Sequence, residues 1–236
     1  MNFLILPGWC LPSDTYRNLK RLLEKKGHRV YVADFPGFKK KLTQPLHLNN
    51  YVEFIRDYIS QNNISRPVII GHSFGGRVAL RLLSTYPSTA SPVILTGVPG
   101  YRSDSSLKIS LFKLIAKTGK PIARFLFSGG LLSLFSKVLY MFAGNFDYYR
   151  ADPLLKETFH TIVNDSLVHD IETVKAETFL VWGKEDVITP LWIGQKMVKN
   201  MKNAHLLVVE EAGHNFPYKD PDKFVAALDT IVRQYH

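Results

Sequence analysis

Residues 67–76 read PVIIGHSFGG and predict a strand, a sharp turn and a helix in direct succession. The apolar run Pro67–Ile70 is typical of a strand buried on both faces, and a helical pattern begins near Phe74. A serine on such a turn is held in a strained backbone conformation that exposes its hydroxyl above the sheet. Ser73 is therefore a candidate nucleophile. The alternative is a glycine-rich turn that only packs the helix on the sheet.

A serine hydroxyl is a weak nucleophile and needs a base that is itself oriented by an acid. The segment FLVWGKEDVITP (179–190) places Asp186 just past a predicted strand, and EEAGHNFP (210–217) places His214 just past the next one. Both would lie on loops at the carboxyl ends of strands, where ligands bind in open α/β sheets. Asp186 would fix the tautomer of His214 and stabilise its protonated form.

Other residues are weaker candidates for the same roles. Glu185 is adjacent to Asp186, but a shift of one residue turns a side chain away, so we interpret it as a solvated neighbour. Asp104, after the fourth predicted strand, is an alternative acid. His72 lies inside the turn, where it would orient the turn or contact a lid. Cys10 is the single cysteine, which excludes a disulfide framework, and the sequence pairs it with no base.

Short apolar runs alternate with helical patterns along the chain, which favours a parallel sheet covered by helices. Six runs predict strands, at 3–6, 29–33, 67–70, 92–96, 178–182 and 205–209. Five patterns predict the covering helices, at 16–26, 48–61, 74–86, 191–201 and 221–234. With 236 residues the chain fits one large domain.

Residues 97–177 interrupt this alternation, because they contain no strand signal. Helical patterns fill the segment at 107–118, 122–127, 131–143 and 154–164. An insertion of this length in such a fold is usually a lid or small subdomain over the active site. We therefore divide the chain into a core, 1–100 and 175–236, and a helical lid, 101–174.

The chain is strongly basic, with 30 Lys and Arg against 20 Asp and Glu. Seven of these cations and one Asp lie between Arg102 and Lys137, in the predicted lid. A basic amphipathic helix there could make a weak contact with an anionic membrane surface or steer an anionic substrate. The favoured interpretation is a lid helix with its apolar face over the site and its lysines in water.

Several classes of partner and location are not expected. No nucleic-acid recognition motif accompanies the charge, and no dinucleotide, phosphate-loop or metal-ligand motif indicates a cofactor or a metal. The start MNFLILPGW lacks a basic region and stops its apolar run at Pro7-Gly8, unlike a signal peptide. The apolar stretch 125–142 is interrupted by polar residues and glycines, so no spanning helix is expected. We expect a cytoplasmic protein.

Together the motifs resemble the α/β-hydrolase superfamily, and most of all its small, lidded serine carboxylesterases. The resemblance rests on five motifs in order, LPGW (6–9), DFPGF (34–38), GHSFGG (71–76), VWGKEDVITP (181–190) and EEAGHNFP (210–217). It implies a minimal, mostly parallel sheet of about six strands, with a helical lid inserted after the fourth. It places Ser73, Asp186 and His214 in a catalytic triad. It also places the backbone N–H groups of Trp9 and Phe74 in an oxyanion hole.

The resemblance implies a serine hydrolase that cleaves small-molecule carboxylic esters with an apolar acyl or aryl group, through an acyl-enzyme. A serine at the turn argues against dehalogenases and epoxide hydrolases, which need a carboxylate nucleophile there. C–C bond hydrolases, thioesterases, lactonases and acyltransferases use the same triad and stay open, as does a non-catalytic receptor on this fold. Pro7-Gly8 replaces the usual His-Gly of the first loop, so the hydrogen bonding of that loop is expected to differ.

Overall fold

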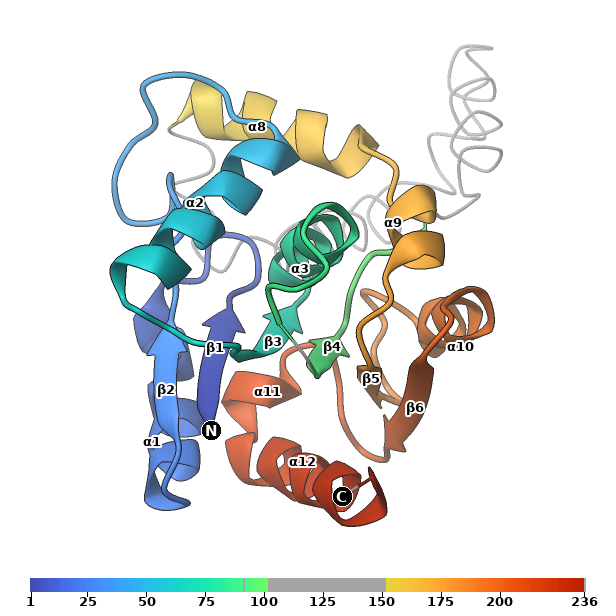
Figure 1. The fold of residues 1–236 in the computed structure, drawn as a ribbon. Helices are drawn as coiled ribbons and strands as arrows, with labels where there is room; N and C mark the ends of the chain where they lie inside the picture. Colours follow the sequence, from blue (N-terminus) through green and yellow to red (C-terminus); the bar gives the residue numbers. More distant parts are fainter. Residues whose placement is uncertain (91, 102–151, 236) are drawn as a thin grey trace, which may run out of the picture.

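The computed structural model describes residues 1–90, 92–101 and 152–235, and these form one six-stranded sheet with helices on both faces (Figure 1). The strand order is β2-β1-β3-β4-β5-β6, and every neighbouring pair is parallel. This confirms the predicted fold class. The strands are β1 (Asn2–Leu6), β2 (Arg29–Val32), β3 (Val68–His72), β4 (Val93–Thr96), β5 (Thr178–Gly183) and β6 (Ala204–Val209).

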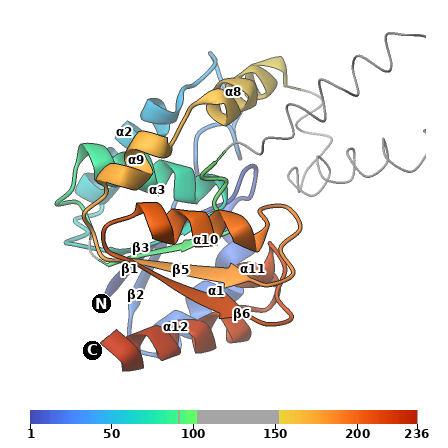
Figure 2. The same cartoon turned by 90° about the vertical axis from the view of Figure 1, so that its right-hand side faces the viewer.

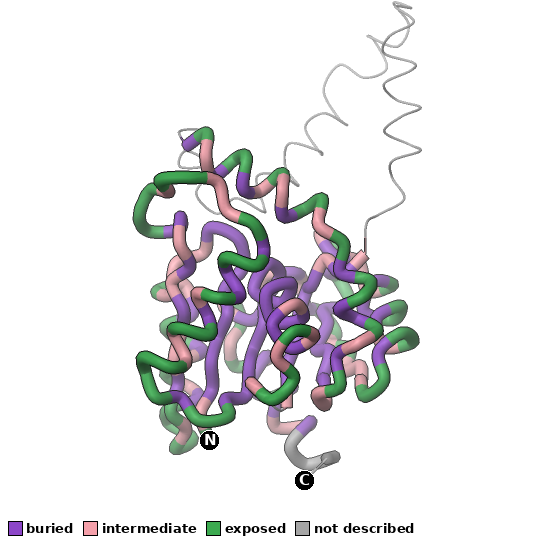
Figure 3. The backbone as a smooth tube through the Cα atoms, turned by 45° about the horizontal axis from the view of Figure 1, so that its top comes forward, coloured by how far each residue is buried: buried purple, intermediate pink, exposed green. Residues whose placement is uncertain are grey.

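The strands at the centre of the sheet are apolar because both of their faces are covered. All residues of β3 and β5 are buried, whereas most of the edge strand β6 is only half-buried. In the middle of the sheet Ile70 lies in register with Ile5 of β1 and Ile94 of β4. Figure 3 shows this buried centre, with the exposed residues on the outer faces of the surrounding helices.

Helices cover the two faces of the sheet unequally (Figure 2). One face carries α1 (Arg17–Lys25), preceded by a 3₁₀ turn at Ser13–Tyr16, with α11 (Phe216–Lys219) and α12 (Pro221–Tyr235). The other face carries α2 (Leu48–Gln61), α3 (Phe74–Thr85) and α10 (Leu191–Asn200). Alternate residues of β1 divide between the two cores, because successive strand side chains point to opposite faces. Leu4 and Leu6 join one core, and Phe3 and Ile5 join the other.

Two helices precede β5 and lie on the side of α2 and α3. The first, α8 (Pro153–Asn164), is the helix predicted at 154–164, and Asp152 caps it by accepting hydrogen bonds from the N–H groups of Leu154 and Leu155. The second, α9 (Val168–Thr173), was not predicted and packs on α3. The helices predicted at 107–118, 122–127 and 131–143 lie outside the described residues, so the division into core and lid stays a prediction.

Arg77 and Arg81 of α3 attach these two helices to the core. The Arg77 guanidinium donates to the carbonyl oxygens of Ile162 and Asp165, at 2.8 and 2.6 Å. Arg81 donates through Nε to both carboxylate oxygens of Asp170, at 2.9 and 3.0 Å. No helix in the described ranges is long and apolar enough to cross a membrane.

Candidate active site

Ser73 occupies the turn between β3 and α3 in a conformation that side chains rarely adopt. Its φ is 52° and its ψ is −112°, which puts a non-glycine residue at positive φ. Such strain persists only where the surroundings impose it, and it is concentrated at functional sites. The Ser73 N–H donates to the carbonyl oxygen of Thr96 at 2.9 Å, which fixes the turn to β4. The sharp turn predicted for this serine is therefore present.

Glycines around Ser73 allow the helix to start this close to the sheet. A Cβ on Gly75 would lie 2.0 Å from the carbonyl oxygen of Leu6, and one on Gly76 would lie 2.2 Å from Cγ2 of Val98. A larger residue at either position would therefore have to displace backbone or a packed side chain. The glycines thus place the first turn of α3, and with it Ser73, directly against the ends of β1 and β4.

His214 and Asp186 form a buried pair on neighbouring loops. The Nδ1 of His214 lies 2.8 Å from Oδ2 of Asp186. The loops that carry them follow β6 and β5, which pair in register up to their ends. Because the carboxyl ends of parallel strands meet at one edge of the sheet, residues 28 positions apart come into contact there.

Asp186 is held as a carboxylate by a ring of donors. Its Oδ1 accepts from the N–H groups of Ile188 and Thr189, at 2.9 and 2.8 Å, and its Oδ2 accepts from the Thr189 hydroxyl at 2.7 Å. Burial raises the pKa of Asp186, but the hydrogen bonds from His214 and Thr189 outweigh burial and hold the pKa below its usual value. An ionised carboxylate here can orient the imidazole and stabilise a positive charge on it.

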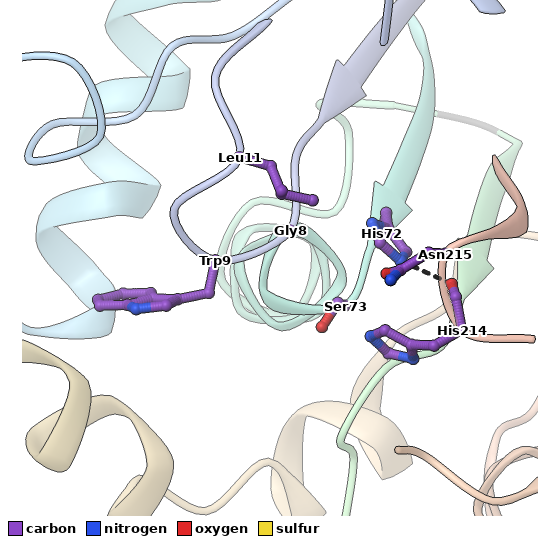
Figure 4. Close-up of a pocket in the computed structure, with 7 residues that line it drawn as sticks. All are labelled: Gly8, Trp9, Leu11, His72, Ser73, His214 and Asn215. Carbon is purple, nitrogen blue, oxygen red and sulfur yellow. Dashed lines mark hydrogen bonds between the residues drawn. The ribbon is translucent and has the colours of Figure 1, made fainter. Parts of the chain in front are cut away.

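Ser73 and His214 line one pocket together with the first loop of the chain (Figure 4). In this view the Ser73 hydroxyl points into the open space beside the His214 ring, while the Trp9 side chain extends away from both. The other residues that line this pocket are Gly8, Trp9, Leu11, His72 and Asn215. The structure therefore brings together Ser73, His214 and Asp186, the three residues that the sequence predicted as a triad.

The two predicted oxyanion donors lie beside Ser73. Trp9 contributes backbone to the pocket, since its ring packs against Phe38, Phe74 and Phe159 at centroid distances of 5.3, 5.1 and 5.2 Å. Phe74 directly follows Ser73 as the first residue of α3. Within the described ranges, no group accepts a hydrogen bond from the backbone N–H of Trp9 or Phe74. Both N–H groups are thus available to a developing negative charge near Ser73.

Among the alternatives, Glu185 is exposed, as predicted, and Asp104 lies outside the described residues. Burial raises the pKa of the Cys10 thiol to about 12, so it stays protonated and is a poor nucleophile. His72 is 1% exposed, and its hydrogen bonds and ring contacts among the described residues go to the core and not to the predicted lid. Its ring instead hydrogen-bonds the Tyr16 hydroxyl and the carbonyl oxygen of His214.

Sequence reasoning missed Tyr16 and Thr189. Tyr16 is 56 positions from its partner His72, and a tyrosine next to an amphipathic helix resembles any core residue. Thr189 did carry a signal, because an aspartate often accepts backbone N–H groups two and three residues further on. That pattern in Asp186–Thr189 could have indicated a carboxylate held in place by its own loop.

Comparison with known proteins places this site in a family. The sequence profile of the alpha/beta hydrolase family matches residues 3–227. The chain therefore belongs to the alpha/beta hydrolase family, and the class of enzyme that fold and relatives support is a hydrolase.

Its relatives carry out more than one hydrolytic reaction. It is 25% identical to the 2-hydroxy-6-oxo-6-phenylhexa-2,4-dienoate hydrolase of Comamonas testosteroni, over 96% of this chain and 83% of the relative. The solved esterase of Exiguobacterium antarcticum is 19% identical with a TM-score of 0.75, over 99% of this chain and 92% of the other. A solved meta-cleavage product hydrolase of Pseudomonas fluorescens is also 19% identical, with a TM-score of 0.69, over 100% and 91%. These solved structures share the fold.

Proposed function

We propose that the protein is a serine hydrolase that cleaves carboxylic esters with an apolar acyl or aryl group through an acyl-enzyme. The observation that carries this proposal is the joint placement of Ser73, on its strained turn, and the buried His214–Asp186 pair around one pocket. A nucleophile, a base and an acid that orients the base are the parts that acyl transfer needs.

The proposed reaction has two steps. In the first, His214 takes the Ser73 proton as the hydroxyl oxygen attacks the ester carbonyl, and the N–H groups of Trp9 and Phe74 stabilise the oxyanion. His214 then gives the proton to the leaving alcohol as the carbon–oxygen bond breaks. In the second step His214 takes a proton from water, the hydroxide attacks the acyl-enzyme, and the proton returns to Ser73 as the acid leaves. Asp186 stabilises the imidazolium in both steps, and no cofactor is required.

The described lining of the pocket favours a neutral, apolar acyl group. Leu11 contributes apolar surface, and none of the described lining residues is Lys or Arg. A carboxylate-bearing substrate would need a cationic or strongly hydrogen-bonding partner once it left water. An uncharged ester needs none.

A second candidate function is hydrolysis of a C–C bond. It is favoured by the relatives, since the Comamonas testosteroni enzyme is named as the hydrolase of a 2-hydroxy-6-oxo-dienoate. A dienoate carries a carboxylate. The same serine, histidine and aspartate would serve that reaction. The two candidates differ in the charge of the substrate, and therefore in what the pocket must hold.

Both candidates can be tested in one experiment. The wild type would be assayed with p-nitrophenyl esters from acetate to laurate and with 2-hydroxy-6-oxo-6-phenylhexa-2,4-dienoate. We expect ester turnover that Ser73→Ala abolishes, and that Ser60→Ala, a change of an exposed serine at the end of α2, leaves unchanged. Turnover of the dienoate alone would replace the ester proposal with C–C hydrolysis. Folded wild type that turns over neither would overturn both.

A further inference from the structure

A buried chain of hydrogen bonds runs from the first loop to the loop of His214 and passes through His72, the residue before Ser73. The N–H of Gly8 lies 3.1 Å from the Tyr16 hydroxyl, and this hydroxyl lies 2.6 Å from Nδ1 of His72. On the other side of the ring, Nε2 of His72 lies 3.0 Å from the carbonyl oxygen of His214. The chain therefore begins one residue before the proposed donor Trp9 and ends on the backbone of the proposed base.

The chemistry of the groups fixes the direction of every hydrogen bond in the chain. A carbonyl oxygen only accepts, so Nε2 of His72 carries the hydrogen that it donates to His214. Burial and the neighbouring His214 lower the pKa of His72 to about 3, so its ring is neutral and Nδ1 is an acceptor. The Tyr16 hydroxyl must then donate to Nδ1, and it accepts from Gly8 with its oxygen. Each hydrogen bond in the chain therefore has one possible direction. Rotating the ring or the hydroxyl would leave at least one of these hydrogen bonds unmade.

The packing around His72 is as restrictive as its hydrogen bonds. A Cβ on Gly8 would lie 3.1 Å from Nδ1 and 3.3 Å from Cε1 of His72, so the first loop lies directly on the edge of the ring. Tyr16 and His72 are essentially inaccessible, at 0% and 1% exposure. The His72 and His214 rings lie 5.0 Å apart. A neutral His72 therefore adds no repulsion when His214 takes up a proton.

We propose that His72 and Tyr16 are positioning residues that hold the oxyanion loop and the loop of the catalytic base at a fixed separation across Ser73. The inference rests on the proposed function, because it assigns the two loops the roles given above. Neither residue touches the substrate in this scheme. Each acts through a backbone, Tyr16 through the N–H of Gly8 and His72 through the carbonyl of His214. Misplacement of catalytic groups by about 1 Å can cost about a hundredfold in rate.

Two single variants break the link between Tyr16 and His72 from opposite sides. Tyr16→Phe removes the hydroxyl. His72→Gln removes the Nδ1 acceptor but can still present an amide N–H to the carbonyl oxygen of His214. Tyr218→Phe is the matched control, because its ring packs on Tyr16 and His72, at centroid distances of 5.6 and 6.0 Å, and its hydroxyl bonds no described residue.

The rate of Ser73 labelling by a fluorophosphonate would be measured for each variant, together with kcat and KM on an ester and the melting temperature. We expect Tyr16→Phe and His72→Gln to slow labelling and lower kcat by about 10- to 100-fold, with KM changed less than about threefold. The double variant should be no slower than the slower single one, because both changes break the same link. Tyr218→Phe should match the wild type.

The outcomes separate this inference from the proposed function. Wild type that the fluorophosphonate does not label would overturn both. Labelled wild type with variants that react equally fast, or whose defects multiply in the double variant, would overturn the positioning role alone. A purely structural role predicts rates that follow melting temperature and recover on cooling. If Tyr16→Phe does not fold, His72→Gln and Tyr218→Phe still decide the matter.

Discussion

The Nδ1 of His214 lies 2.8 Å from Oδ2 of Asp186, and the two side chains are only 6% and 2% exposed. A buried carboxylate is tolerated where it is paired and hydrogen-bonded, and Asp186 has three donors from its own loop besides His214. The pair therefore does two things. It secures the contact between the loops after β5 and β6, and it presents the other side of the imidazole to the pocket that Ser73 lines.

Replacing Asp186 by asparagine should lower kcat by about 10⁴ with little change in fold, because an amide can stabilise the wrong tautomer of His214 and carries no charge. Glu185→Gln is the matched control. It removes a carboxylate one position earlier, where the side chain is exposed, and should change kcat less than twofold. Steady-state kinetics on one ester, with circular dichroism for the fold, would check both. Asp186→Asn activity within tenfold of wild type would contradict the role of this acid.

Gly75→Ala should prevent stable folding, because the new Cβ would lie 2.0 Å from backbone oxygen at Leu6. The cost should exceed about 4 kcal/mol, which is exceptional for one substitution. Gly27→Ala is the control, because it introduces backbone strain without a steric clash. Gly27 has a φ of 83° but nothing within 4 Å of a new Cβ, so we expect a loss of about 1 kcal/mol. Soluble yield and urea unfolding would compare the two, and similar stabilities would show that the close approach is not rigid.

The sequence predicted the elements whose pattern is local. Each of the six predicted strands overlaps an observed one. The four central strands leave continuous apolar runs because both of their faces are covered. The turn at Ser73 was also predictable, since its glycines are required by contacts within a few residues and with adjacent strands. The helix α9 was not predicted, because it is six residues long and packs on α3 through residues far away in the chain.

The chain of hydrogen bonds from Gly8 through Tyr16 and His72 to His214 could not be predicted from the sequence either. Tyr16 and His72 meet only because β1 and β3 are neighbours in the sheet. Nothing in either local pattern distinguishes this tyrosine from a core residue or this histidine from a packing residue. Contacts of this kind are set by tertiary structure, whereas the candidate triad was predicted from motifs that each lie on one loop.

Arg81→Met should destabilise the protein by about 3 kcal/mol, because it leaves Asp170 buried without its cation. The Asp170 side chain is 4% exposed and accepts from Nε of Arg81 through both oxygens. Lys184→Met is the control for loss of a cation. The Lys184–Glu210 pair is 56% and 68% exposed, so water screens it and its loss should leave stability nearly unchanged. Equal effects in urea unfolding would contradict a role for Arg81 in attaching α9.

His72 predicts how the stability of the protein depends on pH. Its pKa is lowered from 6.5 to about 3 in the folded protein, mainly by burial. Between these values the unfolded chain binds a proton that the folded chain does not, so stability falls as pH falls from 6.5 toward 3. At pH 4.5 this one group should have removed about 2–3 kcal/mol of the stability present at pH 7.

The variant His72→Gln isolates that contribution, because glutamine does not titrate. It is expected to be less stable than wild type at pH 7 and to lose less stability on acidification, so the difference should shrink by about 2–3 kcal/mol at pH 4.5. His160→Gln makes the same substitution at an exposed position of α8, and it should leave the stability at pH 7 close to that of wild type. Urea unfolding would be measured at pH 7, 5.5 and 4.5, and because wild type and variant share every carboxylate, carboxylate titration largely cancels in their difference. A constant difference between wild type and His72→Gln across these three values would mean that His72 accepts a proton in the folded state. The fixed direction of the hydrogen bonds from Tyr16 to His214 would then be lost, since a protonated ring has no acceptor for the tyrosine hydroxyl.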